Sequence, residues 1–194
     1  MPGQALTRRT GAIRAGRGLA LLVAASGPAG AAPDPYSNVT YVYYDVTGHD
    51  AASIRASMDP QRPVDPADGQ PYDALTAWRI DWRWDGDGRG GCDLGTTRVS
   101  FSATITFPRL DPSGVPPAVL AEWNRFAAGL RAHELQHVRH AADRLDDIAR
   151  ALRSATCETA NARGEAVLEQ IRAQDRDFDA RTEHGRAQGL RFPG

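Results

Sequence analysis

The 194-residue chain contains no lysine, because all 23 of its basic residues are arginine. This absence excludes a P-loop lysine, a Schiff-base lysine and a serine–lysine catalytic pair. The formal net charge is only −1, so the composition gives no indication of nucleic-acid binding. No apolar run approaches the roughly 20 residues that a membrane-spanning helix needs. The length and the 41% hydrophobic content predict one soluble globular domain.

Cysteine is almost as scarce, with only Cys92 and Cys157. Two cysteines without a CxxC spacing cannot form a four-cysteine zinc site or a dithiol redox motif. In an oxidising compartment the two are expected to pair and to close a loop of about 65 residues, which the chain-entropy model values at ~4 kcal/mol. The alternative is a pair of buried free thiols.

The N-terminal segment differs in composition from the rest of the chain. Four arginines without any acid accompany the apolar run Leu19–Ala25, and Ala29–Ala31 offers small residues for cleavage. This pattern predicts a signal peptide over residues 1–32 and a single mature domain over residues 33–194, which is secreted or periplasmic. A retained membrane anchor is the alternative, and the pair Arg8–Arg9 does not decide between the general and the twin-arginine export routes.

Hydrophobic periodicity divides the mature chain into a strand-rich first half and a helical second half. Strands are predicted at 41–46, 78–84 and 99–107, with a short helix over 49–58. The glycine-rich segment 85–91 satisfies GxGxxG, but it lies between two strands, so we interpret it as a hairpin turn. The predicted fold class is therefore α+β with a mostly antiparallel sheet.

Two long helices are predicted in the second half. The first has an apolar stripe from Trp123 to Leu152, with residues three and four apart on one face. The second is expected to run back antiparallel from about Glu158 to beyond Phe178, and Gly185 is its expected stop.

The first helix contains the HExxH motif, which runs from His133 through Glu134 to His137. Residues four apart lie one above the other on a helix, so both imidazoles can bind one zinc ion while the glutamate reaches a water on that ion. Zinc lowers the pKa of that water towards ~7, Glu134 removes its proton, and the hydroxide attacks a peptide carbonyl. Two alternatives remain open: an ion-paired helix without metal, and a zinc site without catalysis.

A third metal ligand must come from elsewhere in the chain. The antiparallel return of the second helix brings its last part to the level of His133, at a rise of about 1.5 Å per residue. We favour His184, because it stands just before Gly185, where a non-helical backbone can re-aim its side chain. Asp179 is the second choice, with the alternative role of orienting a histidine ligand, and His140 is expected to support a ligand or to face substrate. The other candidates at this level are Asp175, Asp177 and Glu183. The alternative role for His184 is that of a cation at a helix C-terminus.

Several segments together resemble a bacterial family of predicted secreted zinc-dependent proteases that is also described as a domain of unknown function. The similar segments extend over most of the mature chain and include YYDVTG (Tyr43–Gly48), AWRIDWRW (Ala77–Trp84), W..F...L..HELQH (Trp123–His137) and FDARTEHG (Phe178–Gly185). The resemblance implies an exported, zincin-like α+β protein with metal ligands at His133 and His137 and a general base at Glu134. It does not imply a substrate.

The sequence therefore predicts an exported zinc metallopeptidase with Zn²⁺ held by His133, His137 and His184, and with Glu134 as the general base. Its expected partner is a peptide or protein substrate, with no nucleic acid and no membrane in the mature form, and the protein is expected to be a monomer. The alternative is a zinc-binding envelope protein with a binding or adaptor role and no turnover. A helical-hairpin protein without metal is the third possibility.

Overall fold

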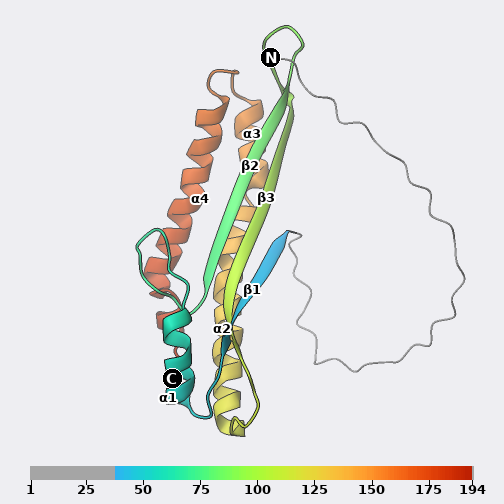
Figure 1. The fold of residues 1–194 in the computed structure, drawn as a ribbon. Coiled ribbons are helices and arrows are strands. Elements are labelled where there is room, and N and C mark those ends of the chain that lie inside the picture. The colour runs from blue at the N-terminus through green and yellow to red at the C-terminus, as the bar shows by residue number, and fades with distance from the viewer. Residues whose placement is uncertain (1–37, 194) are drawn as a thin grey trace, which may run out of the picture. The chain divides into compact units, whose positions relative to one another are not determined.

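A computed structural model of the chain describes residues 38–193 (Figure 1). The predicted signal peptide, residues 1–32, lies outside the described residues. None of the helices within 38–193 is both long enough and apolar enough to cross a membrane.

In the described part of the chain three strands form one sheet in the order β1-β3-β2 (Figure 1). Strands β2 (Leu75–Gly86) and β3 (Cys92–Leu110) form a long antiparallel hairpin, so the glycine-rich segment between them is a turn, as predicted. Strand β1 (Val39–Val46) pairs in parallel with the second half of β3, from Val39 opposite Ala103 onwards. The sheet is thus mostly antiparallel, as expected, with β1 as the parallel exception.

One face of this sheet is apolar and the other faces solvent. In β3, the serine and threonine residues at 100, 102 and 104 are exposed, whereas the residues between them are buried: Phe101, Ala103, Ile105 and Phe107. This alternation follows from the period of two in an extended strand. The helices pack on the apolar face and bury the core between themselves and the sheet.

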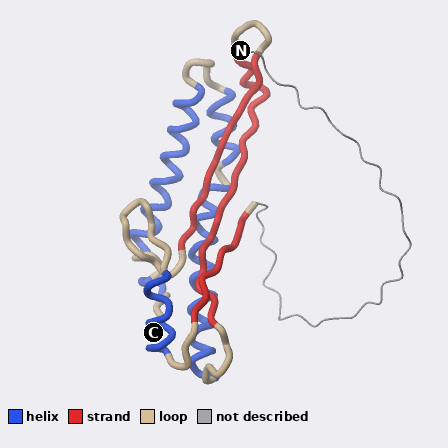
Figure 2. The backbone as a smooth tube through the Cα atoms, viewed as in Figure 1, coloured by secondary structure: helices blue, strands red, loops and turns tan. Residues whose placement is uncertain are grey.

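Within residues 38–193 four α-helices accompany the sheet, and Figure 2 shows long helices running along the strands. Helix α1 (Ala51–Met58) follows β1, and the last three are α2 (Pro117–Ala142), α3 (Leu145–Arg153) and α4 (Ala160–Thr182). Helices α2 and α3 together occupy the place of the first predicted helix. That helix is bent rather than straight, because the backbone leaves helical geometry at Arg144 (φ −104°, ψ 5°).

The last helix ends close to the predicted stop. Helix α4 terminates at Thr182, and the next three residues have positive φ angles of 49° at Glu183, 52° at His184 and 87° at Gly185. Left-handed backbone is unusual for residues other than glycine and redirects the side chains that follow a helix. The chain therefore turns sharply at His184, as the sequence predicted.

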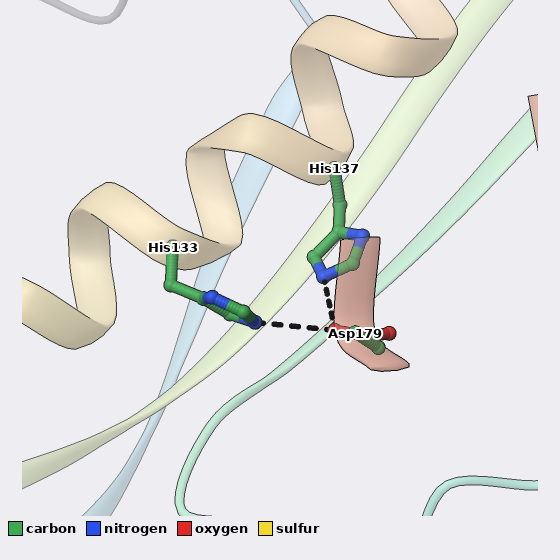
Figure 3. A group of neighbouring side chains, drawn as sticks. All are labelled: His133, His137 and Asp179. Atoms are coloured by element: carbon green, nitrogen blue, oxygen red, sulfur yellow. Dashed lines mark hydrogen bonds and ion pairs between the residues drawn. The ribbon is translucent and has the colours of Figure 1, made fainter. Parts of the chain in front are cut away.

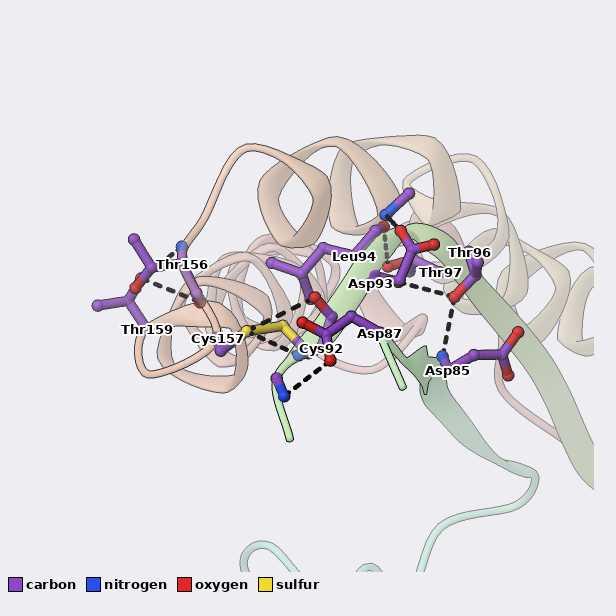
Figure 4. The surroundings of a disulfide bond; sticks show 12 residues. Asp85, Asp87, Cys92, Asp93, Leu94, Thr96, Thr97, Thr156, Cys157 and Thr159 are labelled. Carbon is purple, nitrogen blue, oxygen red and sulfur yellow. Dashed lines mark hydrogen bonds between the residues drawn. A yellow bond between two sulfur atoms is a disulfide. The ribbon is translucent and has the colours of Figure 1, made fainter. Parts of the chain in front are cut away.

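The predicted disulfide is present between Cys92 and Cys157, whose Cα atoms lie 5.8 Å apart (Figure 4). It joins the first residue of β3 to the turn between α3 and α4. Disulfides are typical of proteins in oxidising compartments, so this bond fits a location outside the cytoplasm.

Candidate metal centre

Two histidines of α2 and one aspartate of α4 converge on a common point (Figure 3). His133 and His137 lie one helical turn apart, as the HExxH spacing predicts. The Nε2 atoms of His133 and His137 lie 3.2 Å and 3.1 Å, respectively, from Oδ1 of Asp179. The histidine side chains are buried and that of Asp179 is 21% exposed. These three groups could therefore hold a metal ion that is largely shielded from solvent.

The chemistry of this donor set fits a tetrahedral metal ion such as Zn²⁺. Imidazole nitrogen and carboxylate oxygen are both common zinc ligands. Ligand atoms at about 2.0–2.2 Å from a tetrahedral zinc ion lie roughly 3.3–3.5 Å from one another. The two separations between Nε2 and Oδ1 fall only slightly below that spacing. For these two pairs of atoms, binding a cation would require only a small increase in separation.

The other ring nitrogens of the two histidines also have partners. Nδ1 of His133 lies 3.1 Å from Oε1 of Gln188, and Nδ1 of His137 lies 3.1 Å from Oδ1 of Asp175. Both partners are acceptors, so we assign a hydrogen to each Nδ1. A histidine that donates from Nδ1 has a lone pair at Nε2 when neutral, which is the form that binds a metal.

The electrostatics of the cluster favour positive charge at its centre. Burial alone would raise the pKa of Asp179, but hydrogen bonds from His133 and His137 outweigh burial and hold that pKa well below its usual range. Burial alone would lower the pKa of His137, but its hydrogen bonds with Asp175 and Asp179 raise the pKa to about 10. Two carboxylates thus stabilise the protonated form of His137, and a metal ion at Nε2 would have to displace that proton.

Glu134, the predicted general base, lies on α2 between the two histidines and is buried. The hydroxyl group of Thr76 on β2 donates to Oε2 of Glu134 at 2.8 Å, and its oxygen also lies 3.1 Å from the main-chain carbonyl oxygen of Glu134. Burial raises the pKa of Glu134, while His137 and the hydrogen bond from Thr76 oppose this shift. A carboxyl group with a raised pKa is suited to accepting and returning a proton near neutral pH.

His184, the predicted third ligand, lies beside the three converging donors. Its Nδ1 atom is 3.6 Å from Oδ1 of Asp179, while its Nε2 atom lies 3.1 Å from the hydroxyl of Tyr72. The rings of Tyr72 and His184 stack with centroids 4.1 Å apart. Asp179, the second choice from the sequence, occupies the position between the two histidines of HExxH. The assignment of His184 as a ligand stays a prediction.

His140, the third histidine of α2, contacts a second carboxylate. Its Nδ1 atom lies 2.7 Å from Oδ1 of Asp175, the residue that also accepts from His137. His137, His140 and Asp175 form a second group whose atoms could hold a metal ion. The two groups share His137, which faces Asp179 with one nitrogen and Asp175 with the other.

A cavity of about 930 Å³ contains the three donors and Glu134 on its wall. Every residue from 70 to 80 lines it, and the opposite wall includes residues from the second half of α4. Lining residues 75–80 belong to β2, which within residues 38–193 pairs with no strand other than β3. Its volume lies at the upper end of the range for small-molecule sites.

Residues 41–185 match the model of a family described as bacterial protein of unknown function (DUF922). The match spans more than half of the chain. The chain belongs to the DUF922 family. The matched residues include His133, Glu134, His137 and Asp179, and the family description states no function. No curated protein and no solved structure matches the chain.

Sequence reasoning missed several residues that complete the centre of this DUF922 protein. Thr76 and Gln188 belong to no motif, and each contacts an HExxH residue far away in the chain. The period of two in β2 places Thr76 on the same face as Trp78 and Ile80, which is the inward face. A polar residue at that inward position was the one signal in the sequence that pointed to Thr76.

Proposed function

We propose that this protein is an exported zinc-dependent peptidase. The proposal depends above all on the convergence of both HExxH histidines on Asp179 beside the buried Glu134. His133 and His137 would hold the ion, with Asp179 favoured as the third ligand by its position and His184 as the other candidate. A zinc ion so held acidifies a water and polarises a carbonyl group.

The residues of the chain have distinct roles in this proposal. Glu134 takes a proton from the attacking water, whose oxygen joins the peptide carbonyl carbon. The same carboxyl then gives the proton to the departing nitrogen as the C–N bond breaks. Thr76 holds Oε2 of Glu134 and so orients the carboxylate for both transfers.

The shape of the cavity supports a polypeptide substrate. Residues 70–80 all line the cavity, and six of them, 75–80, belong to β2, which is an edge strand among the described residues. An extended peptide can pair with a free strand edge through its main-chain groups. Recognition of this kind suits unfolded chains or exposed loops of many sequences.

The disulfide supports export to the periplasm or the medium. A bond between Cys92 and Cys157 persists in oxidising compartments and is rare in the cytosol. The leader-like segment over residues 1–32 supports the same location.

A zinc-binding adaptor without turnover is the second candidate. It is favoured by the burial of Glu134 and by its hydrogen bond with Thr76, because a carboxylate engaged within the protein can serve a purely structural role. Zinc content and hydrolysis, measured together, separate the two candidates.

The test uses protein isolated from the cell envelope, with zinc content measured beside hydrolysis of an unfolded protein. We expect Glu134→Gln to retain about one zinc per chain while hydrolysis falls at least ~100-fold, the contribution of a positioned base. His137→Ala should lose the metal. Glu165→Gln is the matched control, because that side chain is 58% exposed on α4, and it should change neither quantity.

Each other outcome contradicts a defined part of the proposal. Full activity in Glu134→Gln excludes this mechanism. Zinc without hydrolysis in the wild type favours the adaptor, and a wild type that retains no zinc excludes both candidates.

A further inference from the structure

Asp175 is an acceptor for three donors from two other elements of the fold. Its Oδ1 atom lies 3.1 Å from Nδ1 of His137 and 2.7 Å from Nδ1 of His140, both on α2. Its Oδ2 atom accepts from Nε1 of Trp78 on β2 at 2.7 Å. The Asp175 side chain is 15% exposed. A carboxylate can accept several hydrogen bonds at once, so all three contacts are satisfied together.

This arrangement permits two roles for Asp175. In the first, His137, His140 and Asp175 hold a second metal ion. That role requires His137 to bind one metal at Nε2 and another at Nδ1, so the ring must lose both of its hydrogens. In the second role, Asp175 accepts the Nδ1 hydrogen of a neutral His137 and orients its ring. The second role needs no unusual form of histidine, and it uses all three hydrogen bonds as they stand.

The packing around His137 supports the orienting role. Phe178, one turn after Asp175 on α4, lies against the rings of His133, His137 and His140 at centroid distances of 4.7, 5.2 and 5.3 Å. An apolar ring contacts these histidines without offering a polar group. The hydrogen bond with Asp175 therefore determines the orientation of the His137 ring, with Nδ1 towards Asp175 and Nε2 towards Asp179.

We propose that Asp175 is a positioning residue that fixes His137 with Nε2 towards the metal, and that His140 and Trp78 hold Asp175 in turn. The proposal rests on the metal site proposed above but not on peptidase activity. It assigns a function to His140, which the HExxH motif leaves unexplained. It also gives Trp78 a polar role on the inward face of β2.

The main test is Asp175→Asn, with zinc affinity measured by competition with a chelator. The amide keeps one oxygen for the two histidines, but its NH₂ group then meets Nε1–H of Trp78, donor against donor. We expect zinc affinity to fall roughly 10–100-fold, the usual effect of removing a partner that orients a metal ligand. The absorption spectrum of the Co²⁺-loaded variant should also change, because the spectrum depends on ligand geometry.

A second substitution tests the direction of the effect. Trp78→Phe removes the opposing N–H, so Asp175→Asn combined with Trp78→Phe should bind zinc more tightly than Asp175→Asn alone. Such a rescue would not follow from a general loss of packing. Asp177→Asn is the matched control, since it makes the same change at an exposed position of the same helix, and it should bind zinc like the wild type.

Three results would overturn the proposal. The first is wild-type zinc affinity in Asp175→Asn. The second is two zinc ions per wild-type chain, one of which is lost in Asp175→Asn, because this identifies a second metal site. The third is a wild type that binds no zinc, which also removes the proposed function. If thermal unfolding shows that zinc-free Asp175→Asn does not fold, Trp78→Phe alone decides: several-fold weaker zinc binding supports the proposal and unchanged binding contradicts it.

Discussion

Helix α4 is attached to the rest of the protein near both ends, but by different chemistry. Just before its first residue, Cys157 is covalently bound to β3 (Figure 4). Towards its other end, Asp175 contacts His137 and His140 of α2, and Asp179 contacts His133 and His137 (Figure 3 shows the contacts of Asp179). A disulfide holds two segments together whatever else is bound. A buried cluster of ionisable groups holds them only while every charge has a partner.

This difference separates stability from function along one helix. The disulfide limits the freedom of the unfolded chain, so its effect does not depend on a ligand. The histidine–aspartate cluster takes ionisable groups out of water, and a cation at its centre offsets that cost. We therefore expect changes at the first end to alter folding and changes at the second end to alter zinc binding.

The largest effect is expected from removal of the disulfide by Cys92→Ser with Cys157→Ser. Loss of this cross-link should lower the free energy of unfolding by ~4 kcal/mol. Zinc affinity should stay unchanged, because about 22 Å of helix separates the start of α4 from Asp175 at 1.5 Å per residue. Urea unfolding and zinc titration measure the two quantities. Reduction of the wild type serves as control, and a large loss of zinc affinity would show that the two ends are coupled.

The next effect concerns the third ligand and compares Asp179→Ala, His184→Ala and His140→Ala. Asp179→Ala should weaken zinc binding more than ~100-fold, which corresponds to about 2.7 kcal/mol, because its oxygen lies between the two histidines. If a residue only supports a ligand, its variant should bind zinc roughly 10–100-fold more weakly than the wild type. Competition with a chelator measures the zinc affinity of all three variants. A greater loss in His184→Ala would establish the ligand set predicted from the sequence, and wild-type binding in that variant would exclude it.

The smallest effect is expected from Thr76→Val, which keeps the side-chain shape but removes the hydroxyl. Loss of the hydrogen bond with Glu134 should cost about 1 kcal/mol, and hydrolysis should fall several-fold. Zinc content should not change, because Thr76 contacts the base and not the ligands. Thr104→Val, on the exposed face of β3, is the matched control. Loss of zinc instead of activity would assign Thr76 to the metal-binding side of the site.

Much of the fold could be predicted because each strand and helix has a local period. Alternation along β3 predicted its buried face, and spacings of three and four predicted α2 and α4. The parallel pairing of β1 could not be predicted in this way, because a period specifies which face is buried and not which neighbour lies beside it. The bend at Arg144 could not be predicted for a related reason. The apolar stripe continues past Arg144 to the buried Ile148 and Leu152, so the hydrophobic period does not change there.

The candidate site divides in the same way. His133, Glu134 and His137 lie on one helix, where a spacing of four residues already determines that the two imidazoles face one side. Estimating the level of α4 from helix rise brought Asp175, Asp177, Asp179, Glu183 and His184 into consideration, and the preference for His184 came from the expected end of the helix. Helix rise did not resolve which of them faces the histidines. The rise per residue predicts the position of a residue along the helix axis to within about one turn. Which side chain faces the histidines depends on the rotation of the helix about its axis and on the backbone after the helix ends.

The sequence by itself therefore determined the sheet's buried face, the two long helices, the only possible disulfide and the histidine pair with its glutamate. The tertiary structure alone decided that Asp179 lies between the histidines, that Asp175 and Gln188 bind their outer nitrogens, and that Thr76 holds the glutamate. The physical reason is the separation in sequence between the residues that make each contact. Contacts within a helix follow from its repeat, whereas contacts between α2, α4 and β2 depend on how whole elements pack against one another.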